Sequence, residues 1–232
     1  MAKKIWKNYK SGLRWFLIST VFGEAGASAV GSTAVIFLSL HIGLTAGQIG
    51  VFFEVSLLGV ILGTKLGAFV SRRTNPNISL QLSNLGLFVT IVVGCWLVEY
   101  SPFKELTYLW GLSIGTFLGW FYPCEALFLS GCIPVNVETE VAGFFNWCSV
   151  ILSWLPPLGF TLVVENNKAL PWALTVVAAF FVPAIFLLRM CGPWEEIEAE
   201  AKRKEMSFYE SGQLNVAVAD IEDGEEEPQP EQ

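Results

Sequence analysis

Polar and ionisable side chains inside apolar segments are the first sign of chemistry in this chain. Five of them lie in stretches long enough to cross a membrane: Glu24, Glu54, Lys65, Glu125 and Asn146. An ionisable group within a bilayer is energetically costly, so it normally faces a partner or a water-filled cavity. Glu24, near the middle of its segment, therefore predicts a proton- or substrate-coupling site. A buried structural hydrogen bond is the alternative.

The other members of this set lie nearer the predicted membrane surfaces. Glu54 and Lys65 are eleven residues apart, so they share nearly the same face of a helix, about 16 Å apart along its axis. Glu125 follows Pro123 by two residues. Each of these charges could reach an interface by extending its side chain. They are therefore candidates for coupling, with an interfacial role as the alternative.

A second notable feature is the stretch from residue 134 to residue 165. It opens with an acidic turn that contains Glu138 and Glu140, and its apolar part contains Pro156 and Pro157. A double proline inside a spanning helix frees backbone groups that lipid cannot satisfy. The pair of prolines therefore predicts a flexing point, or hinge, in that helix.

The elements that must position these side chains are six apolar segments. The chain has 232 residues, of which 53% are hydrophobic and 15% are charged, a composition typical of a multi-span membrane protein. Each segment is long enough to cross a hydrocarbon core of about 30 Å. The expected spans are 13–41, 48–70, 78–98, 106–131, 141–164 and 169–190. The sequence thus predicts an all-α integral membrane protein with six transmembrane helices.

The basic residues predict the orientation of the spans. An even number of spans puts both termini on one side, and that side holds eleven Lys or Arg residues against two on the other. The positive-inside rule then places both termini in the cytoplasm. A cleaved signal peptide ending near Ala29 is the alternative for the start. Cleavage would leave five spans with conflicting loop charges.

Charge also divides the chain into three parts. Residues 1–12 form a basic cytoplasmic segment, residues 13–190 a membrane domain, and residues 191–232 an acidic tail with three basic and thirteen acidic residues. Such a tail predicts disorder and a cytoplasmic partner. The five cysteines form no C-x-x-C pair, so we interpret them as small buried hydrophobes.

Small residues recur at spacing of four in three of the spans. The ladders start at Gly23, Gly59 and Gly111. This spacing places small residues on one helix stripe, where backbones can approach closely within lipid. The third and sixth spans lack such a ladder. We therefore expect spans one, two, four and five to be central and spans three and six to be peripheral.

The stretch from Gly67 to Arg73, read as Gly-x-x-x-Ser-Arg-Arg, resembles the loop that follows the second helix in each half of major facilitator superfamily transporters. Residues 12–165 more narrowly resemble the C-terminal half of the autophagy-related vacuolar amino-acid effluxers. The residues from Gly119 to Phe144 carry that second likeness. The chain departs from the family at Glu125, where a basic residue is expected, and at Glu24, where Asp is expected.

The resemblance implies a fold of six helices equal to one half (a 3+3 repeat) of a major facilitator. It also implies a cytoplasmic latch in which Arg72 or Arg73 pairs with Glu138 or Glu140. The implied function is alternating-access transport of small polar metabolites, such as amino acids, out of a vacuole or a lysosome-like compartment. Facilitators need two halves to enclose a midplane site. The resemblance therefore implies a second six-helix half, or a homodimer, as a partner.

Other functions are less well supported by the sequence. A non-transporting membrane scaffold or accessory subunit, with the acidic tail binding its partner, is the main alternative. A channel would need a filter-like or charged-ring segment. We expect no enzymatic activity, cofactor or metal, since the sequence contains a single His and no nucleophile motif. The absence of a basic patch interleaved with aromatics argues against nucleic acid as a partner.

Overall fold

The computed structural model describes residues 11–100, 105–133, 138–166, 170–203 and 206. These residues form helices joined by short turns, with no strand among them. The helices are α2 (Ser11–Ile36), the π-helix η1 (Phe37–His41), α3 (Ala46–Arg73), α4 (Pro76–Tyr100), α5 (Leu106–Cys132), α6 (Glu138–Ile151), α7 (Leu155–Glu165), α8 (Leu170–Ala178) and α9 (Phe181–Arg189).

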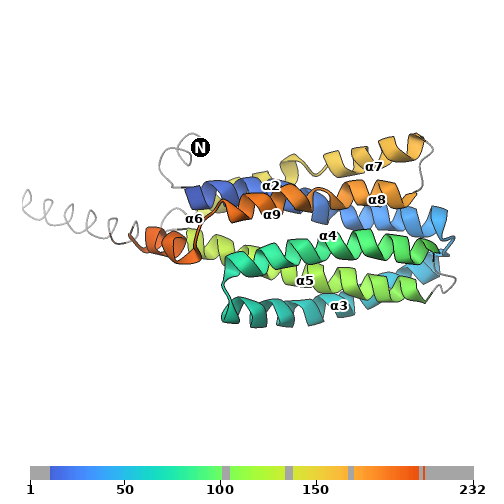
Figure 1. Ribbon diagram of the computed structural model, residues 1–232, viewed down its shortest axis with the longest axis horizontal. Coiled ribbons are helices and arrows are strands. Elements are labelled where there is room, and N and C mark those ends of the chain that lie inside the picture. The colour runs from blue at the N-terminus through green and yellow to red at the C-terminus, as the bar shows by residue number, and fades with distance from the viewer. Residues whose placement is uncertain (1–10, 101–104, 134–137, 167–169, 204–205, 207–232) are drawn as a thin grey trace, which may run out of the picture.

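Six helical spans run back and forth along one axis (Figure 1). All six are long and apolar enough to cross a membrane, and each agrees with an expected segment to within a few residues. This confirms the all-α membrane fold. We name the end at which α2 begins and α9 ends the terminal end. The end at which α3 and α8 begin is the distal end.

The fifth and sixth spans are each interrupted near a proline. The fifth breaks at residues 152–154, directly before Pro156 and Pro157, and α7 begins at Leu155. The sixth breaks at residues 179–180, shortly before Pro183. Proline lacks a backbone N–H and crowds the preceding turn, which explains both breaks. The sequence predicted the first interruption but not the second.

The glycine ladders of α3 and α5 form the most extensive helix contact in the described chain. A Cβ on Gly63 would overlap the carbonyl oxygen of Thr116, and one on Gly115 would overlap that of Ser56. The two backbones therefore touch along the ladders. Across this contact, the Thr64 hydroxyl donates to the Gly119 carbonyl at 3.1 Å. The predicted role of these two ladders is confirmed.

The ladder of the first span does not behave in this way. A Cβ on Gly31 would meet nothing within 4 Å. The terminal half of α2 instead packs through large rings, because Phe16 stacks on Phe128 of α5 with 4.4 Å between ring centroids. Phe181 of α9 lies over Gly26, 3.0 Å from a Cβ built there. Similar spacing in the sequence thus gives two different kinds of contact.

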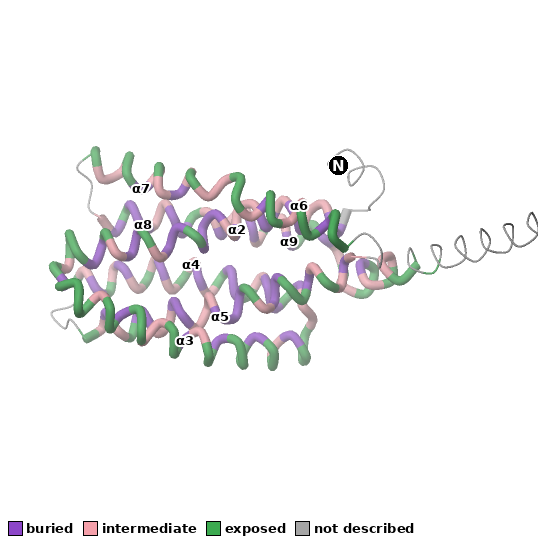
Figure 2. The backbone as a smooth tube through the Cα atoms, turned by 180° about the vertical axis from the view of Figure 1, so that it is seen from behind, coloured by how far each residue is buried: buried purple, intermediate pink, exposed green. Residues whose placement is uncertain are grey.

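Burial within this single chain does not follow the expected division into central and peripheral spans. The windows of the second and fifth spans are each 17% buried, whereas those of the third and sixth are each 39% buried. Helix α4 packs against α5, α8 and α9, which encloses it. A glycine ladder brings α3 close to α5 along one narrow stripe and leaves the rest of α3 exposed (Figure 2).

The acidic tail begins inside the folded domain rather than after it. Residues 194–203 are helical, and the Trp194 ring packs on Phe128 at 5.1 Å and covers Gly131. Ile197 is only 8% exposed and lies against Gly12. The apolar side chains of an otherwise acidic segment therefore fix its first part on the bundle. The rest of the tail, 204–205 and 207–232, lies outside the described residues, as do residues 1–10.

The five cysteines are buried and free, which confirms the interpretation that they act as small hydrophobes. Cys191, just beyond the sixth span, illustrates the consequence. Burial raises the pKa of its thiol to about 12. The thiolate is the reactive form of cysteine, so Cys191 is chemically inert at neutral pH while the chain is folded.

Candidate functional site

Two carboxyl groups meet between α2 and α5 in the interior of the bundle. Glu125 on α5 is 3% exposed, and its carboxyl group interacts with that of Glu24 on α2. The Thr20 hydroxyl, one helical turn before Glu24, faces the same Glu125 carboxyl. We name Glu24 and Glu125 the carboxyl pair. The sequence named both residues as candidates but did not predict that they lie together.

Two further polar groups near the carboxyl pair are buried without a partner in the described structure. Thr20 Oγ1 forms no hydrogen bond of normal geometry, and neither does Asn84 Oδ1 on α4. Asn84 is 1% exposed, and its Oδ1 lies 3.4 Å from a Cβ built on Gly23. Buried polar groups are normally hydrogen-bonded. Oxygen atoms without a protein partner are available to bind a proton or a ligand.

The helices hold these groups in place by ordinary packing. The Phe16–Phe128 stack joins α2 to α5 on the terminal side of the pair. Asn84 Nδ2 donates to the Leu80 carbonyl at 2.8 Å, which fixes the side chain that faces α2. The Tyr122 ring on α5 interacts with both acidic groups and is 46% exposed. The pair is therefore enclosed on one side and opens towards Tyr122 on the other.

Glu125 is almost fully buried, so a negative charge on it is desolvated, and a charge on the half-buried Glu24 beside it would repel it. A proton or a cation bound between the two carboxyl groups would relieve that repulsion. The described residues contain no group of three or more metal-ligating side chains. Two adjacent carboxyl groups are able to bind a proton or a cation.

The other predicted coupling residues lie elsewhere. Glu54 and Lys65 are exposed on the face of α3 that is turned away from its glycine ladder, and Asn146 is exposed on α6. The structure does not bring these three residues to the carboxyl pair. Sequence reasoning missed Thr20 and Asn84. For Asn84 a signal was available, since an amide in the middle of an apolar span usually has a specific environment.

The residues of the predicted latch lie at the terminal end, on two different helices. Arg72 and Arg73 end α3, whereas Glu138 and Glu140 begin α6, which packs along α2. The Arg73 guanidinium lies 4.5 Å from the centre of the Phe69 ring, a cation–π contact. Residues 134–137, the start of the acidic turn, lie outside the described part. The latch stays a prediction.

Ser71, where the facilitator motif has an acidic residue, lies in a buried polar cluster that joins three helices. Its hydroxyl donates to Ser79 Oγ of α4 at 2.8 Å and lies 3.2 Å from Cys124 Sγ of α5. The Trp120 indole also donates to Ser79 Oγ, at 2.9 Å. Ser79 therefore receives hydrogen bonds from α3 and α5 at once. A serine here connects α3 to its neighbours without a carboxylate.

Replacing the shared acceptor should weaken this cluster. We expect Ser79→Ala to lower the free energy of unfolding by about 1–3 kcal/mol, because it leaves the buried Trp120 N–H unpaired and leaves Ser71 with only the weaker Cys124 contact. Thermal unfolding in detergent, followed by tryptophan fluorescence, would measure the change. Ser130→Ala, at an exposed serine that bonds only its own helix, is the control. Equal stability of the two variants would contradict the assigned role.

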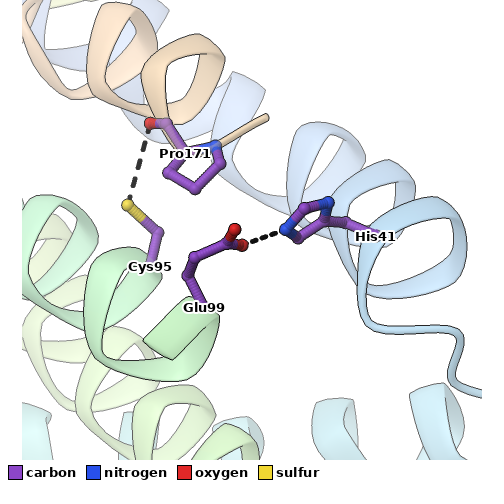
Figure 3. A network of polar contacts seen from close by, with 4 residues as sticks. All are labelled: His41, Cys95, Glu99 and Pro171. Atoms are coloured by element: carbon purple, nitrogen blue, oxygen red, sulfur yellow. Dashed lines mark hydrogen bonds and ion pairs between the residues drawn. The ribbon is translucent and has the colours of Figure 1, made fainter. Parts of the chain in front are cut away.

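A second polar contact joins the distal ends of the first and third spans (Figure 3). His41, at the end of η1, forms an ion pair or hydrogen bond with Glu99 of α4. One turn earlier on α4, Cys95 Sγ donates to the Pro171 carbonyl of α8 at 3.8 Å. Single-turn π-helices often mark places where a side chain is redirected. The sequence did not indicate that His41 pairs with Glu99.

The fold and the carboxyl pair together define a six-span α-helical membrane protein with an ionisable site in its interior. No protein-family model matches the chain, and no curated protein and no solved structure matches it at a significant level. Function therefore has to be argued from the site itself.

Proposed function

We propose that this chain is a membrane transport protein, or half of one, that moves small polar metabolites such as amino acids by alternating access. The observation that carries the proposal is the contact between Glu24 and Glu125 inside the bundle. Ionisable residues within spanning helices most often mark proton relays or substrate pathways. The chain would need no cofactor and would perform no chemical conversion of its cargo.

The carboxyl pair supplies a physical basis for coupling. Its two members lie on α2 and α5, which share only a few backbone contacts apart from the rings near the terminal end. A shared proton or cation holds the two helices together, whereas two ionised carboxylates repel each other. A ligand shifts a conformational equilibrium by its different affinity for the two states. A proton or cation bound at the carboxyl pair would thus favour one position of α2 relative to α5.

The order of helix contacts supports the likeness to one half of a facilitator. The first span packs on the fifth and sixth, the fourth packs on the second and third, and the third packs on the sixth. If span one is exchanged with span four, span two with span five and span three with span six, the same set of contacts results. A protein built from two related three-helix units would have this pattern. A second six-helix half, or a second copy of the chain, would then complete the transport path.

The remaining predicted residues take supporting roles in this proposal. The break before Pro156 and Pro157 would let the distal part of the fifth span bend. The residues Arg72, Arg73, Glu138 and Glu140 would hold the terminal end closed, with both termini in the cytoplasm. Efflux from a vacuole or another endomembrane compartment fits the stated resemblance. Glu54, Lys65 and Asn146, being exposed, would meet lipid headgroups or the proposed second half.

The test is flux of labelled amino acids in proteoliposomes that contain the full chain. Glu24→Gln should abolish coupling to an imposed pH gradient, because the amide cannot exchange a proton. Glu105→Gln removes an exposed carboxylate near the start of α5 and should leave flux unchanged. Wild-type flux in the Glu24→Gln variant would overturn the coupling role.

A non-transporting scaffold or accessory subunit remains the second candidate. The broad exposed apolar face of α3, with Leu57, Ile61 and Leu62, suits contact with another membrane protein. The mass of the native protein in detergent separates the two candidates. A strict monomer without flux supports the scaffold, whereas a dimer with flux supports the transporter.

A further inference from the structure

An apolar cavity of about 160 Å³ lies between α2, α3 and α5. Its exposed lining is apolar and includes Gly31, Ala34, Phe53, Leu57, Ile114 and Leu118. Specific small-molecule sites are mostly apolar hollows with a few polar groups placed to fix orientation. A binding site built on this cavity therefore needs a polar group beside it.

On both α2 and α5, the carboxyl pair lies on the helix face that also lines the cavity. Gly31 follows Glu24 by seven residues on α2, and Leu118 precedes Glu125 by seven residues on α5. Seven residues are close to two helical turns. Gly31 therefore lies on the same side of α2 as Glu24, and Leu118 on the same side of α5 as Glu125, each about 10 Å further along the helix axis. Because α2 and α5 run in opposite directions, both steps lead towards the distal end. The cavity is therefore about two turns distal of the pair.

Ser28 of α2 and Tyr122 of α5 lie on this face between the carboxyl pair and the cavity, and both are exposed. An acidic end and an apolar end thus belong to one continuous face. Their separation fits a ligand about 10 Å long with one polar terminus.

The charge at the polar end of the site determines whether a bound ligand is a cation or an anion. Both members of the pair are acidic, α5 has no Lys or Arg, and the only one on α2 is Arg14, ten residues before Glu24. The amide oxygen of Asn84, buried and without a partner in the described structure, adds a hydrogen-bond acceptor beside the pair. A cation that carries N–H groups would satisfy these oxygens, whereas an anion would be repelled.

We propose that this face binds amphipathic cations, with the positively charged group at Glu24 and Glu125 and the apolar body in the cavity beside Gly31. The inference rests on the proposed function, since it takes the carboxyl pair as the polar end of the transport site. It narrows the substrate class to metabolites that carry a positively charged amino group and an apolar body. Anions and neutral analogues of the same shape are excluded.

Direct binding to the purified full chain tests the inference without any transport step. The probe is 4-phenylbutylammonium, a primary ammonium that carries N–H groups and is a cation at neutral pH. The neutral 4-phenylbutanol and the anionic 5-phenylpentanoate serve as matched ligands. We expect the cation to bind at least tenfold more tightly than either of them in calorimetric titration. Equal binding of all three ligands would overturn the proposal.

Two variants separate the ends of the site. Glu125→Gln should weaken binding of the cation at least tenfold. Gly31→Leu should do the same by filling the cavity, and it should fold, because a Cβ at Gly31 meets nothing within 4 Å. Gly143→Leu on α6, where a Cβ also meets nothing within 4 Å, is the matched control and should bind as wild type does. If Gly31→Leu binds as well as the control does, the cavity is not part of the site.

Failure of this inference is distinguishable from failure of the proposed function. Coupled flux of amino acids without cation binding would overturn the inference and leave the transport function standing. Cation binding that depends on Glu125 and Gly31, in a protein that shows no flux, would support the inference and contradict transport.

Discussion

Gly63→Ala is expected to lower the free energy of unfolding by at least about 3 kcal/mol, the upper end of the range for overpacking a tight contact. The added methyl group would occupy the position of the Thr116 carbonyl oxygen, which belongs to the backbone of α5. A side chain can rotate away from a clash, but a helix backbone cannot. The two helices would have to separate, and the hydrogen bond from Thr64 to Gly119 would be lost with them.

Tryptophan fluorescence during unfolding in detergent is a suitable readout, since Trp110 and Trp120 lie beside this helix contact and are buried. Gly31→Ala is the matched control, because it belongs to a ladder of the same spacing on α2 and has free space for the methyl group. The control should be as stable as wild type or slightly more stable, since alanine favours helix over glycine. Equal destabilisation of both variants would contradict the proposed α3–α5 contact.

Glu125→Gln is expected to reduce flux driven by a pH gradient at least tenfold, which corresponds to about 1.4 kcal/mol in coupling. The glutamine has nearly the same shape but cannot take up or release a proton. Because the two carboxyl groups act as one unit, the double variant Glu24→Gln/Glu125→Gln should lose no more flux than the more severe single variant. Such non-additivity is typical of residues in one network.

The controls for this second prediction address folding and location. All three variants should keep an unfolding transition close to that of wild type, because glutamine has nearly the same shape as glutamate and its amide can form the hydrogen bond across the pair. Glu105→Gln should retain full flux. If the fold reduction of flux in the double variant equals the product of the reductions in the two single variants, Glu24 and Glu125 act independently. The proposal that they form one unit would then be wrong.

Much of the fold could be predicted because hydropathy and length leave few options in a membrane. A spanning segment must satisfy its backbone internally, so each apolar run of sufficient length forms a helix. The glycine ladders at Gly59 and Gly111 were also readable, because repeated small residues allow the closest approach between helices. The same pattern at Gly23 was misread. The spacing predicts which face of a helix carries small residues, but it does not predict whether the backbone of another helix packs against that face.

The carboxyl pair illustrates the same limit for the candidate site. Helical periodicity gives the face on which Glu24 or Glu125 lies, but the rotation of one helix relative to another depends on the packing of the whole bundle. Rings such as Phe16 and Phe128 set that rotation through a contact between residues far apart in the chain. The break before Pro183 was missed because proline is tolerated in many spanning helices, as Pro123 shows within α5.

The most direct test of the central claim is infrared spectroscopy of the full chain in lipid at neutral pH. If Glu24 and Glu125 share a proton, the spectrum should contain the carbonyl band of a protonated carboxyl group, and the band should shift in heavy water. The band should be absent from the Glu24→Gln/Glu125→Gln variant and present in Glu105→Gln. A wild-type spectrum without this band, or a band that survives in the double variant, would contradict the account.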